Sequence, residues 1–153
     1  MQPFEQASFS PAGAGQVVTD RFGRHTIRIA AAETGGRLGV FEAEVPPGEG
    51  PPPHIHDQED EFFRVLSGSF AFWCNGARVD LTADGTLIVP RGAVHRFQNT
   101  GSTPGRLMCV MTPGGFEGFF PAVAANPPES PAAMAAIASR FHLRFVMDAA
   151  EAA

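Results

Sequence analysis

Short apolar runs alternate with turn-forming residues over most of this chain. Between residues 24 and 112, runs rich in Val, Ile, Phe and Leu recur at roughly 8–12-residue intervals and end at Gly, Pro, Asn or Asp. This spacing predicts an all-β sandwich or barrel. Asn75-Gly76 is the strongest hairpin signal, because both residues tolerate the positive φ of a tight turn. Eight strands, which suit a jelly roll, are expected at 24–30, 38–45, 61–66, 69–74, 78–81, 86–89, 94–99 and 107–111.

Residues 1–23 precede this region and have a different texture. They are rich in Gly, Pro, Ser and Gln and show little periodicity. We expect an N-terminal arm here, with Phe4 and Phe9 packing on the body of the protein or on a partner. The β-barrel is then expected to span residues 24–112 as the single domain.

Residues 113–153 are expected to form a helical extension that packs on the barrel. A short helix is expected to begin within 116–120, after a Pro-Gly-Gly turn. Ser130 followed by Pro131 is a typical helix start, so a second helix is predicted from there to about Phe141. Its apolar residues recur at helical spacing and form one buried stripe: Met134, Ile137, Ala138 and Phe141.

Composition excludes several classes of function. The net charge is −5, all eleven basic side chains are Arg, and nucleic acid is therefore not an expected partner. The chain has neither Lys nor Tyr, which excludes Schiff-base chemistry and a phenolic acid. No run approaches the length of a membrane helix, and the N-terminus does not resemble a signal peptide. We expect a cytoplasmic protein in which Cys74 and Cys109 are free, buried thiols.

A cluster of metal-ligand residue types lies between two of the predicted strands. His54 and His56 are two positions apart, so in an extended segment both imidazoles project from one face, with Cα atoms roughly 6.7 Å apart. Glu61 opens the next apolar run, and His95 follows a Pro-x-Gly turn. Three imidazoles and one carboxylate suit a mononuclear site for one divalent ion, whether Fe, Mn, Ni, Cu or Zn.

The acidic residues between the two runs leave an alternative open. Asp57, Glu59 and Asp60 are typical of a solvated turn, and Glu59 competes with Glu61 as the carboxylate ligand. Glu61 is preferred because it lies at the start of a strand, where its side chain can point inward with the imidazoles.

The spacing of these residues resembles the two sequence motifs of the cupin superfamily. The first motif, G-x5-H-x-H-x3-4-E-x6-G, is matched by Gly48, His54, His56, Glu61 and Gly68. The second, G-x5-P-x-G-x2-H-x3-N, is matched by Pro90, Gly92, His95 and Asn99, but Asp84 stands at its first glycine and Gly85 follows. The exchange is expected to reshape a turn and to leave the ligands unaffected.

The resemblance implies a cupin-type jelly-roll barrel with His54, His56, Glu61 and His95 as metal ligands and Asn99 as a structural residue. Finer similarity, in segments 33–37 and 112–120 and the C-terminal helix, is to single-domain bacterial proteins similar to quercetin 2,3-dioxygenase. Where those relatives often have an aromatic residue, this chain has Arg64. Strand alternation from Glu61 places Arg64 on the outer face, as a surface or dimer residue.

Aromatic side chains offer a dry pocket beside the site. The chain has 14 Phe, and four of them are candidates to line a pocket for an aromatic or apolar substrate: Phe63, Phe41, Phe72 and Phe97. His25 and His142 are isolated from the motifs and are expected to be surface or packing residues rather than ligands.

The resemblance and the ligand set together predict a metal-dependent, dioxygenase-like enzyme acting on an aromatic or enolisable small molecule. Glu61 would accept the substrate's hydroxyl proton. Two alternatives remain: a non-catalytic metal- or small-molecule-binding cupin, and a redox-neutral isomerase or cyclase that uses the metal as a Lewis acid. A sugar-phosphate isomerase is disfavoured because the chain lacks a cluster of cations. A homodimer is expected, since jelly rolls leave sheet edges and apolar faces to cover.

Overall fold

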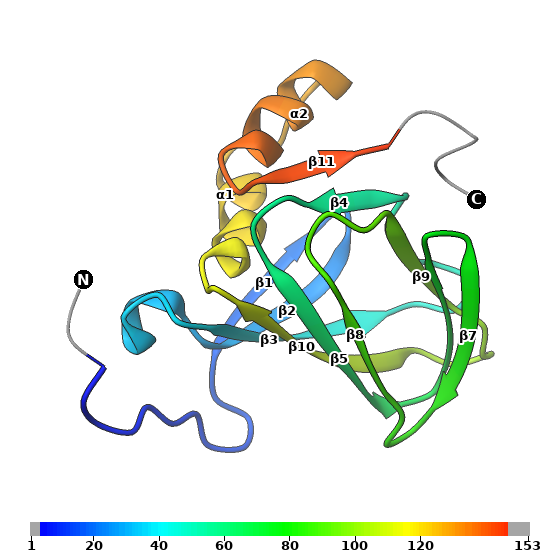
Figure 1. The fold of residues 1–153 in the computed structure, drawn as a ribbon, viewed down its shortest axis with the longest axis horizontal. Coiled ribbons are helices and arrows are strands. Elements are labelled where there is room, and N and C mark those ends of the chain that lie inside the picture. Colours follow the sequence, from blue (N-terminus) through cyan, green and yellow to red (C-terminus); the bar gives the residue numbers. More distant parts are fainter. Residues whose placement is uncertain (1–3, 147–153) are drawn as a thin grey trace.

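Two antiparallel sheets face one another in the computed structural model, which describes residues 4–146 (Figure 1). The predicted arm and extension also include 1–3 and 147–153, which lie outside the described residues. The strand orders are β1-β2-β3-β10-β5-β8 and β11-β4-β9-β6-β7. The strands are β1 Gln16–Asp20, β2 Gly23–Ile29, β3 Gly39–Val45, β4 His54–His56, β5 Asp60–Ser67, β6 Ser69–Cys74, β7 Ala77–Thr82, β8 Thr86–Val89, β9 His95–Asn99, β10 Gly105–Thr112 and β11 Leu143–Phe145.

All eight expected strands are present, and the all-β cupin-type jelly roll with short C-terminal helices is confirmed. Three further strands were not expected. β1 lies in the segment expected to be an arm, where only Val18 is buried, so no apolar alternation marks it. β4 and β11 have three residues each, too few to show a period. Residues 16–20 therefore belong to the six-stranded sheet rather than to an arm.

The core lies between the sheets and is largely aromatic. On β5, Phe63 and Val65 point inward while Arg64 points outward, as period 2 requires. Phe63 meets Phe72 of the opposite sheet with a ring-centroid distance of 5.2 Å. Arg64 pairs with Asp84 at 2.8 Å on the surface, which confirms its outward orientation. The two sheets are thus held together by apolar contacts between their inward-facing side chains.

The helices follow β10 and lie beside one end of the barrel (Figure 1). They are η2 Phe116–Gly118, α1 Phe119–Ala125 and α2 Pro131–Ser139, with η1 Ala31–Thr34 earlier in the chain. The Ser130 hydroxyl accepts a hydrogen bond from the Ala133 N–H at 3.0 Å, so the predicted N-cap is confirmed. Met134 and Ala138 are buried, and α2 packs on α1 and β11. None of the helices within residues 4–146 is long and apolar enough to cross a membrane.

The turn that departs from the cupin motif keeps a glycine-like backbone. Asp84 has φ 72°, in the left-handed region that a glycine adopts without cost and Asp tolerates. A side chain at Gly85 would approach the Thr82 carbonyl oxygen to 2.9 Å, so that position has room only for glycine. The exchanged order therefore satisfies both the conformation and the space that this turn needs.

Candidate metal centre

Four buried side chains meet at one end of the barrel. They come from three strands: His54 and His56 from β4, Glu61 from β5 and His95 from β9. One nitrogen or carboxylate oxygen from each lies within 4.8 Å of the others. None of the four residues is more than 7% exposed. The structure thus brings together the four residues that the sequence singled out.

Strand geometry explains how the side chains converge. His54 and His56 are two positions apart on β4 and point the same way. His54 is the antiparallel register partner of His95, which brings β9 to the same place. Their imidazole centroids are 4.2 Å apart. Glu61 enters from the opposite sheet, and its Oε2 lies 3.0 Å from His95 Nε2 and 3.3 Å from His56 Nε2.

The backbone fixes two of the imidazoles in the orientation that metal ligands use. Nδ1 of His54 lies 2.9 Å from the Pro52 carbonyl oxygen, and Nδ1 of His95 lies 3.0 Å from that of Ala93. An Nδ1–H donated to a carbonyl leaves Nε2 as a free lone pair. These Nε2 atoms would be the donors toward an ion. Together with the Glu61 carboxylate they fit a first-row divalent ion.

Electrostatics favour a neutral His54 and a charged Glu61, whereas His95 holds a proton more tightly than usual. Burial lowers the pKa of His54 well below its usual value, and the neighbouring His95 and His56 lower it further, so its imidazole is neutral. Burial acts to raise the pKa of Glu61, but His56 and His95 outweigh it and hold that pKa below its ordinary value. Neutral imidazoles and a charged carboxylate are the forms that bind a metal ion. Burial would lower the pKa of His95, yet its hydrogen bond with Glu61 raises it, so a cation here would displace a shared proton.

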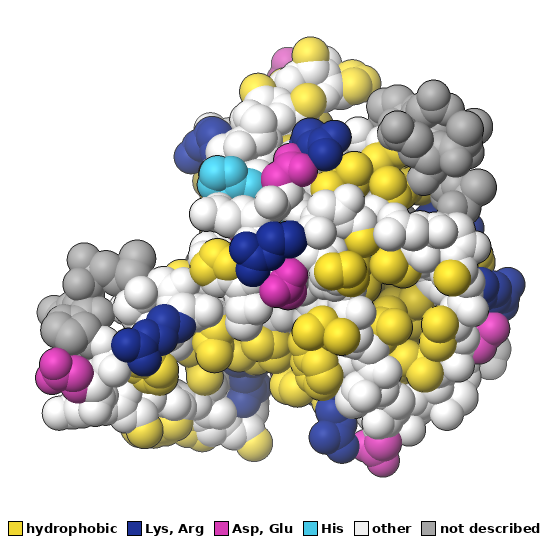
Figure 2. Space-filling model, viewed as in Figure 1, with side chains coloured by type: hydrophobic (Ala, Val, Ile, Leu, Met, Phe, Trp, Pro, Cys, Tyr) yellow, Lys and Arg dark blue, Asp and Glu magenta, His cyan; other side chains and the backbone are white. Residues whose placement is uncertain are grey.

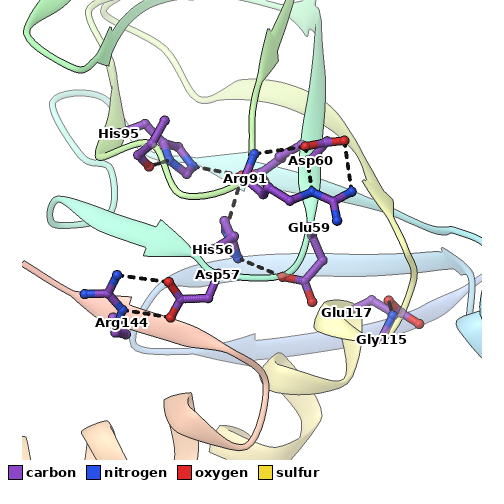
Figure 3. A network of polar contacts seen from close by, with 11 residues as sticks. His56, Asp57, Glu59, Asp60, Arg91, His95, Gly115, Glu117 and Arg144 are labelled. Atoms are coloured by element: carbon purple, nitrogen blue, oxygen red, sulfur yellow. Dashed lines mark hydrogen bonds and ion pairs between the residues drawn. The ribbon is translucent and has the colours of Figure 1, made fainter.

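The acidic turn after β4 is only partly solvated. Asp57 forms a two-pronged ion pair with Arg144 of β11 at 2.7 and 2.9 Å, and Asp60 pairs with Arg91 (Figure 3). Asp60 also accepts a hydrogen bond from the Arg91 backbone N–H at 2.9 Å. These ion pairs connect β11 and the turn before β9 to the segment that follows β4. A simple solvated turn was the alternative expected from the sequence. The sequence did not indicate that these residues connect distant segments, because ion pairs between distant segments leave no local pattern.

Glu59, the alternative carboxylate ligand, lies outside the four-residue cluster. It is nevertheless buried, at 3% exposed, and burial raises its pKa. Its Oε2 lies 3.8 Å from His56 Nδ1, too far for a hydrogen bond. That Nδ1 is buried and has no hydrogen-bond partner among the described residues. Glu59 therefore stands behind His56, on the side away from Glu61 (Figure 3).

A mostly apolar cavity opens beside the cluster. His54, His56 and Glu61 line it, and Phe41 and Phe97 are the two expected pocket residues that also do. The other two expected residues, Phe63 and Phe72, do not line this cavity; they fill the core between the sheets. The sequence offered all four as pocket candidates but could not separate the core from the cavity wall. Further apolar residues of the lining are Phe22, Phe116, Phe119, Phe120, Leu143 and Phe145.

One wall of the cavity comes from the segment after β10, which the sequence predicted as a helix start without assigning it to the site. Glu117 is buried there, and its carboxylate accepts hydrogen bonds from the backbone N–H groups of Ala31 at 2.5 Å and Gly115 at 2.8 Å. This anchor fixes the neighbouring Phe116, whose ring lies 4.4 Å from that of His56. The density of Phe in 116–120 was the available signal for this wall.

His25 of β2 also lines the cavity. It is 5% exposed, and its ring stacks on that of Phe120 with a centroid distance of 3.6 Å and an interplanar angle of 14°. Burial lowers the pKa of His25 to about 4, so the imidazole is neutral near pH 7. As expected, His25 is not a member of the cluster, but the sequence gave no reason to place it in the cavity lining. His142 is exposed and lies in a turn with φ 58°.

The Cupin domain family matches residues 41–111, a segment that includes all four cluster residues. This segment of the chain is therefore similar to a cupin domain. Solved structures share its architecture. KdgF from Halomonas sp. superposes with a TM-score of 0.63 over 72% of this chain and 96% of that chain, at 15% identity. An RmlC-like cupin from Shewanella frigidimarina gives 0.60 over 71% and 93%, at 19% identity. At these identities the likeness shows the fold alone.

Curated relatives of the cupin domain come from bacteria and fungi. The tetracenomycin polyketide synthase protein TcmJ of Streptomyces glaucescens is 36% identical over 80 residues, 52% of this chain and 52% of that protein. Protein SchB of Streptomyces halstedii is 35% identical over 83 residues, 54% and 59% of the two chains. Oxidoreductase macE of Penicillium terrestre is 38% identical over 66 residues, 42% and 25%. The matches to TcmJ and SchB span little more than half of each protein, and none of these three relatives is named as a quercetin 2,3-dioxygenase.

Proposed function

We propose that this protein is a metal-dependent enzyme that moves a proton, without net oxidation, in an enolisable aromatic or polyketide-like small molecule. Isomerisation and ring closure are the reactions that such a transfer serves. The observation that carries the proposal is the position of the Glu61 carboxylate, which is buried beside three imidazoles and lines a cavity with an apolar wall. The name of TcmJ, a polyketide synthase protein, supports the substrate class.

The three histidines and Glu61 would hold one divalent ion, with Fe, Mn, Ni, Cu and Zn all compatible with the donor set. When bound, such an ion polarises a carbonyl oxygen and makes the adjacent C–H more acidic. The Phe-rich wall excludes water, which strengthens the electrostatic interactions inside the cavity. The reacting carbonyl would therefore sit at the cluster end of the cavity, with the apolar rings of the substrate along the Phe side chains.

Glu61 would act as the base. Its Oε2 faces His56 and His95, whereas no described residue hydrogen-bonds to its Oε1. Oε1 would take the proton from the carbon next to the carbonyl and return it to another position of the same molecule, so that atoms and electrons balance. The chain has neither Lys nor Tyr, so no amine or phenol competes for this role.

Deuterium exchange tests this proposal directly. The protein, loaded with each candidate metal in turn, is incubated anaerobically with 1-tetralone in D₂O, and exchange at the carbon next to the carbonyl is followed by NMR. We expect exchange that falls roughly 100-fold or more in Glu61→Gln, the size typical of a lost general base. His142→Asn is the matched control, because Asn tolerates the positive φ at that exposed turn. Exchange that is absent with every metal, or equal in Glu61→Gln, would overturn the proposal.

Oxygen-dependent ring cleavage is the second candidate, and the relative named oxidoreductase macE favours it. The same donor set holds the redox-active ions that dioxygenases use. An oxygen electrode separates the two candidates: the proposed proton transfer consumes no oxygen. Oxygen uptake that depends on Glu61 and is stoichiometric with loss of an enolisable substrate would instead establish the dioxygenase.

A further inference from the structure

His25 is a buried polar group in an otherwise apolar part of the cavity. It lies on β2 and points inward between Val18 and Ala43, its register partners on the neighbouring strands. Neither of its ring nitrogens has a hydrogen-bond partner among the described residues, and Nδ1 is fully buried. A buried nitrogen without a partner is destabilising, so native proteins leave few of them. A partner supplied by a bound molecule is one explanation for such a nitrogen.

The position of His25 relative to the cluster is set by a chain of ring contacts. From His56, the ring centroids of Phe116, Phe120 and His25 follow at steps of 4.4, 5.5 and 3.6 Å. These steps set an upper limit on the separation of the two imidazoles, and a molecule of two or three fused rings fits within that limit. His25 and the cluster line the same cavity. A flat substrate with its reacting carbonyl at the cluster would therefore direct its far end toward His25.

We propose that His25 is a second polar contact for the substrate, which hydrogen-bonds an oxygen at the end of the molecule remote from the metal cluster. The inference rests on the proposed function and names the substrate more narrowly: a planar, fused-ring molecule with oxygen at both ends. Burial keeps the imidazole neutral, so it offers one N–H donor and one acceptor nitrogen. It suits a hydroxyl or a carbonyl, and not a carboxylate or a phosphate, which would need a cation.

Stacking on Phe120 explains how the contact would be kept in place. The two rings are nearly parallel, so the imidazole is held by one face, and Nε2 at its edge, unlike the fully buried Nδ1, is the nitrogen that could contact a ligand. His25 is thus a positioning residue for the remote end, and Glu61 acts at the reacting end. Loss of His25 should weaken binding of the long substrate without removing metal or proton transfer.

A matched pair of probes tests the contact: 1-tetralone, and 6-hydroxy-1-tetralone, which adds one hydroxyl at the far end of the same ring system. Dissociation constants are measured by calorimetry on the metal-loaded protein. Since one hydrogen bond contributes about 1 kcal/mol, the wild type should bind the hydroxylated probe roughly fivefold more tightly. His25→Phe keeps the stacking ring but removes both nitrogens, so the preference should disappear while 1-tetralone binds within about twofold of wild type. His25→Gln, which retains a hydrogen-bond donor and an acceptor, should show part of the wild-type preference for the hydroxylated probe.

Three results would overturn the inference: no preference in the wild type, a preference that survives in His25→Phe, or failure of both probes to bind. Thermal melting at pH 7 guards against a purely structural role. We expect His25→Phe to melt at or above the wild-type temperature, and a drop of several degrees with unchanged preference would assign His25 to packing. Deuterium exchange of 1-tetralone does not need His25. If deuterium exchange occurs but the wild type does not prefer the hydroxylated probe, this inference alone is refuted. If the preference for the hydroxylated probe depends on His25 but no deuterium exchange occurs, only the proposed function is refuted.

Discussion

A metal ion should stabilise this fold by an amount that depends on all four cluster residues. The ligands come from three strands and converge only when β4, β5 and β9 are assembled, so the unfolded chain offers no comparable site. Metal ion at a free concentration of 100 times its dissociation constant then stabilises the folded state by about 2.7 kcal/mol. For a chain of this length, 1 kcal/mol shifts the melting temperature by about 2–4 °C, so we expect a shift of about 8 °C.

Differential scanning fluorimetry measures the shift, with chelator-treated protein as the reference. His56→Ala removes one ligand and also leaves a cavity, so the quantity to compare is the metal-induced shift and not the melting temperature itself. We expect that shift to fall below about 2 °C in His56→Ala and to stay near 8 °C in His142→Asn, whose exposed side chain lies outside the cluster. An equal shift in wild type and His56→Ala, or none in wild type with any of the five metals, would refute the ligand assignment.

Three further predictions concern single residues. Asn99→Ala should lower the free energy of unfolding, measured in urea, by about 3 kcal/mol, because the fully buried Asn99 amide makes hydrogen bonds to three backbone groups. Gln98→Ala, at the neighbouring position, is the control and should lower it by less than about 1 kcal/mol. As pH falls from about 6.5 to 4, His25 becomes protonated in the unfolded chain before it does in the folded protein. The free energy of unfolding of the wild type should therefore fall by about 3 kcal/mol relative to that of His25→Phe. Parallel profiles of unfolding free energy against pH would contradict this. Glu61→Gln should retain at least half of its metal by elemental analysis, because three imidazoles remain, and equal metal loss to that of His56→Ala would show that the carboxylate is an essential ligand.

The eight expected strands and the four cluster residues were predictable because their information is local. Alternation along β5 fixes which side chains face inward, and the His-x-His spacing places two imidazoles on one face of an extended segment. The start of α2 was marked in the same way by Ser130 and Pro131. In each case the residues that determine the structure are neighbours in the chain.

The remaining features depend on contacts between distant segments. β11 has only three residues and forms because β4 offers an unpaired edge, which no local pattern reports. The cavity wall combines Phe41 with Phe120 and Phe145, which come together only once the helices are packed. Glu59 was expected in solvent and is buried, because β11 and the turn at Arg91 close over this end of the barrel. On the face shown in Figure 2, acidic and basic side chains lie next to one another, as such cross-links require.

The pairing of β11 with β4 has a consequence for synthesis on the ribosome. β4 carries two of the four cluster residues but pairs with β9 only through His54 and His95; its other edge is covered by Leu143–Phe145. Leu143 and Phe145 also line the cavity. Most of the barrel can pair while the chain is still being made, but the strand that presents two histidines is enclosed only after residue 145 has emerged. A nascent chain stalled before residue 145 would therefore leave the two histidines of β4 at an open edge.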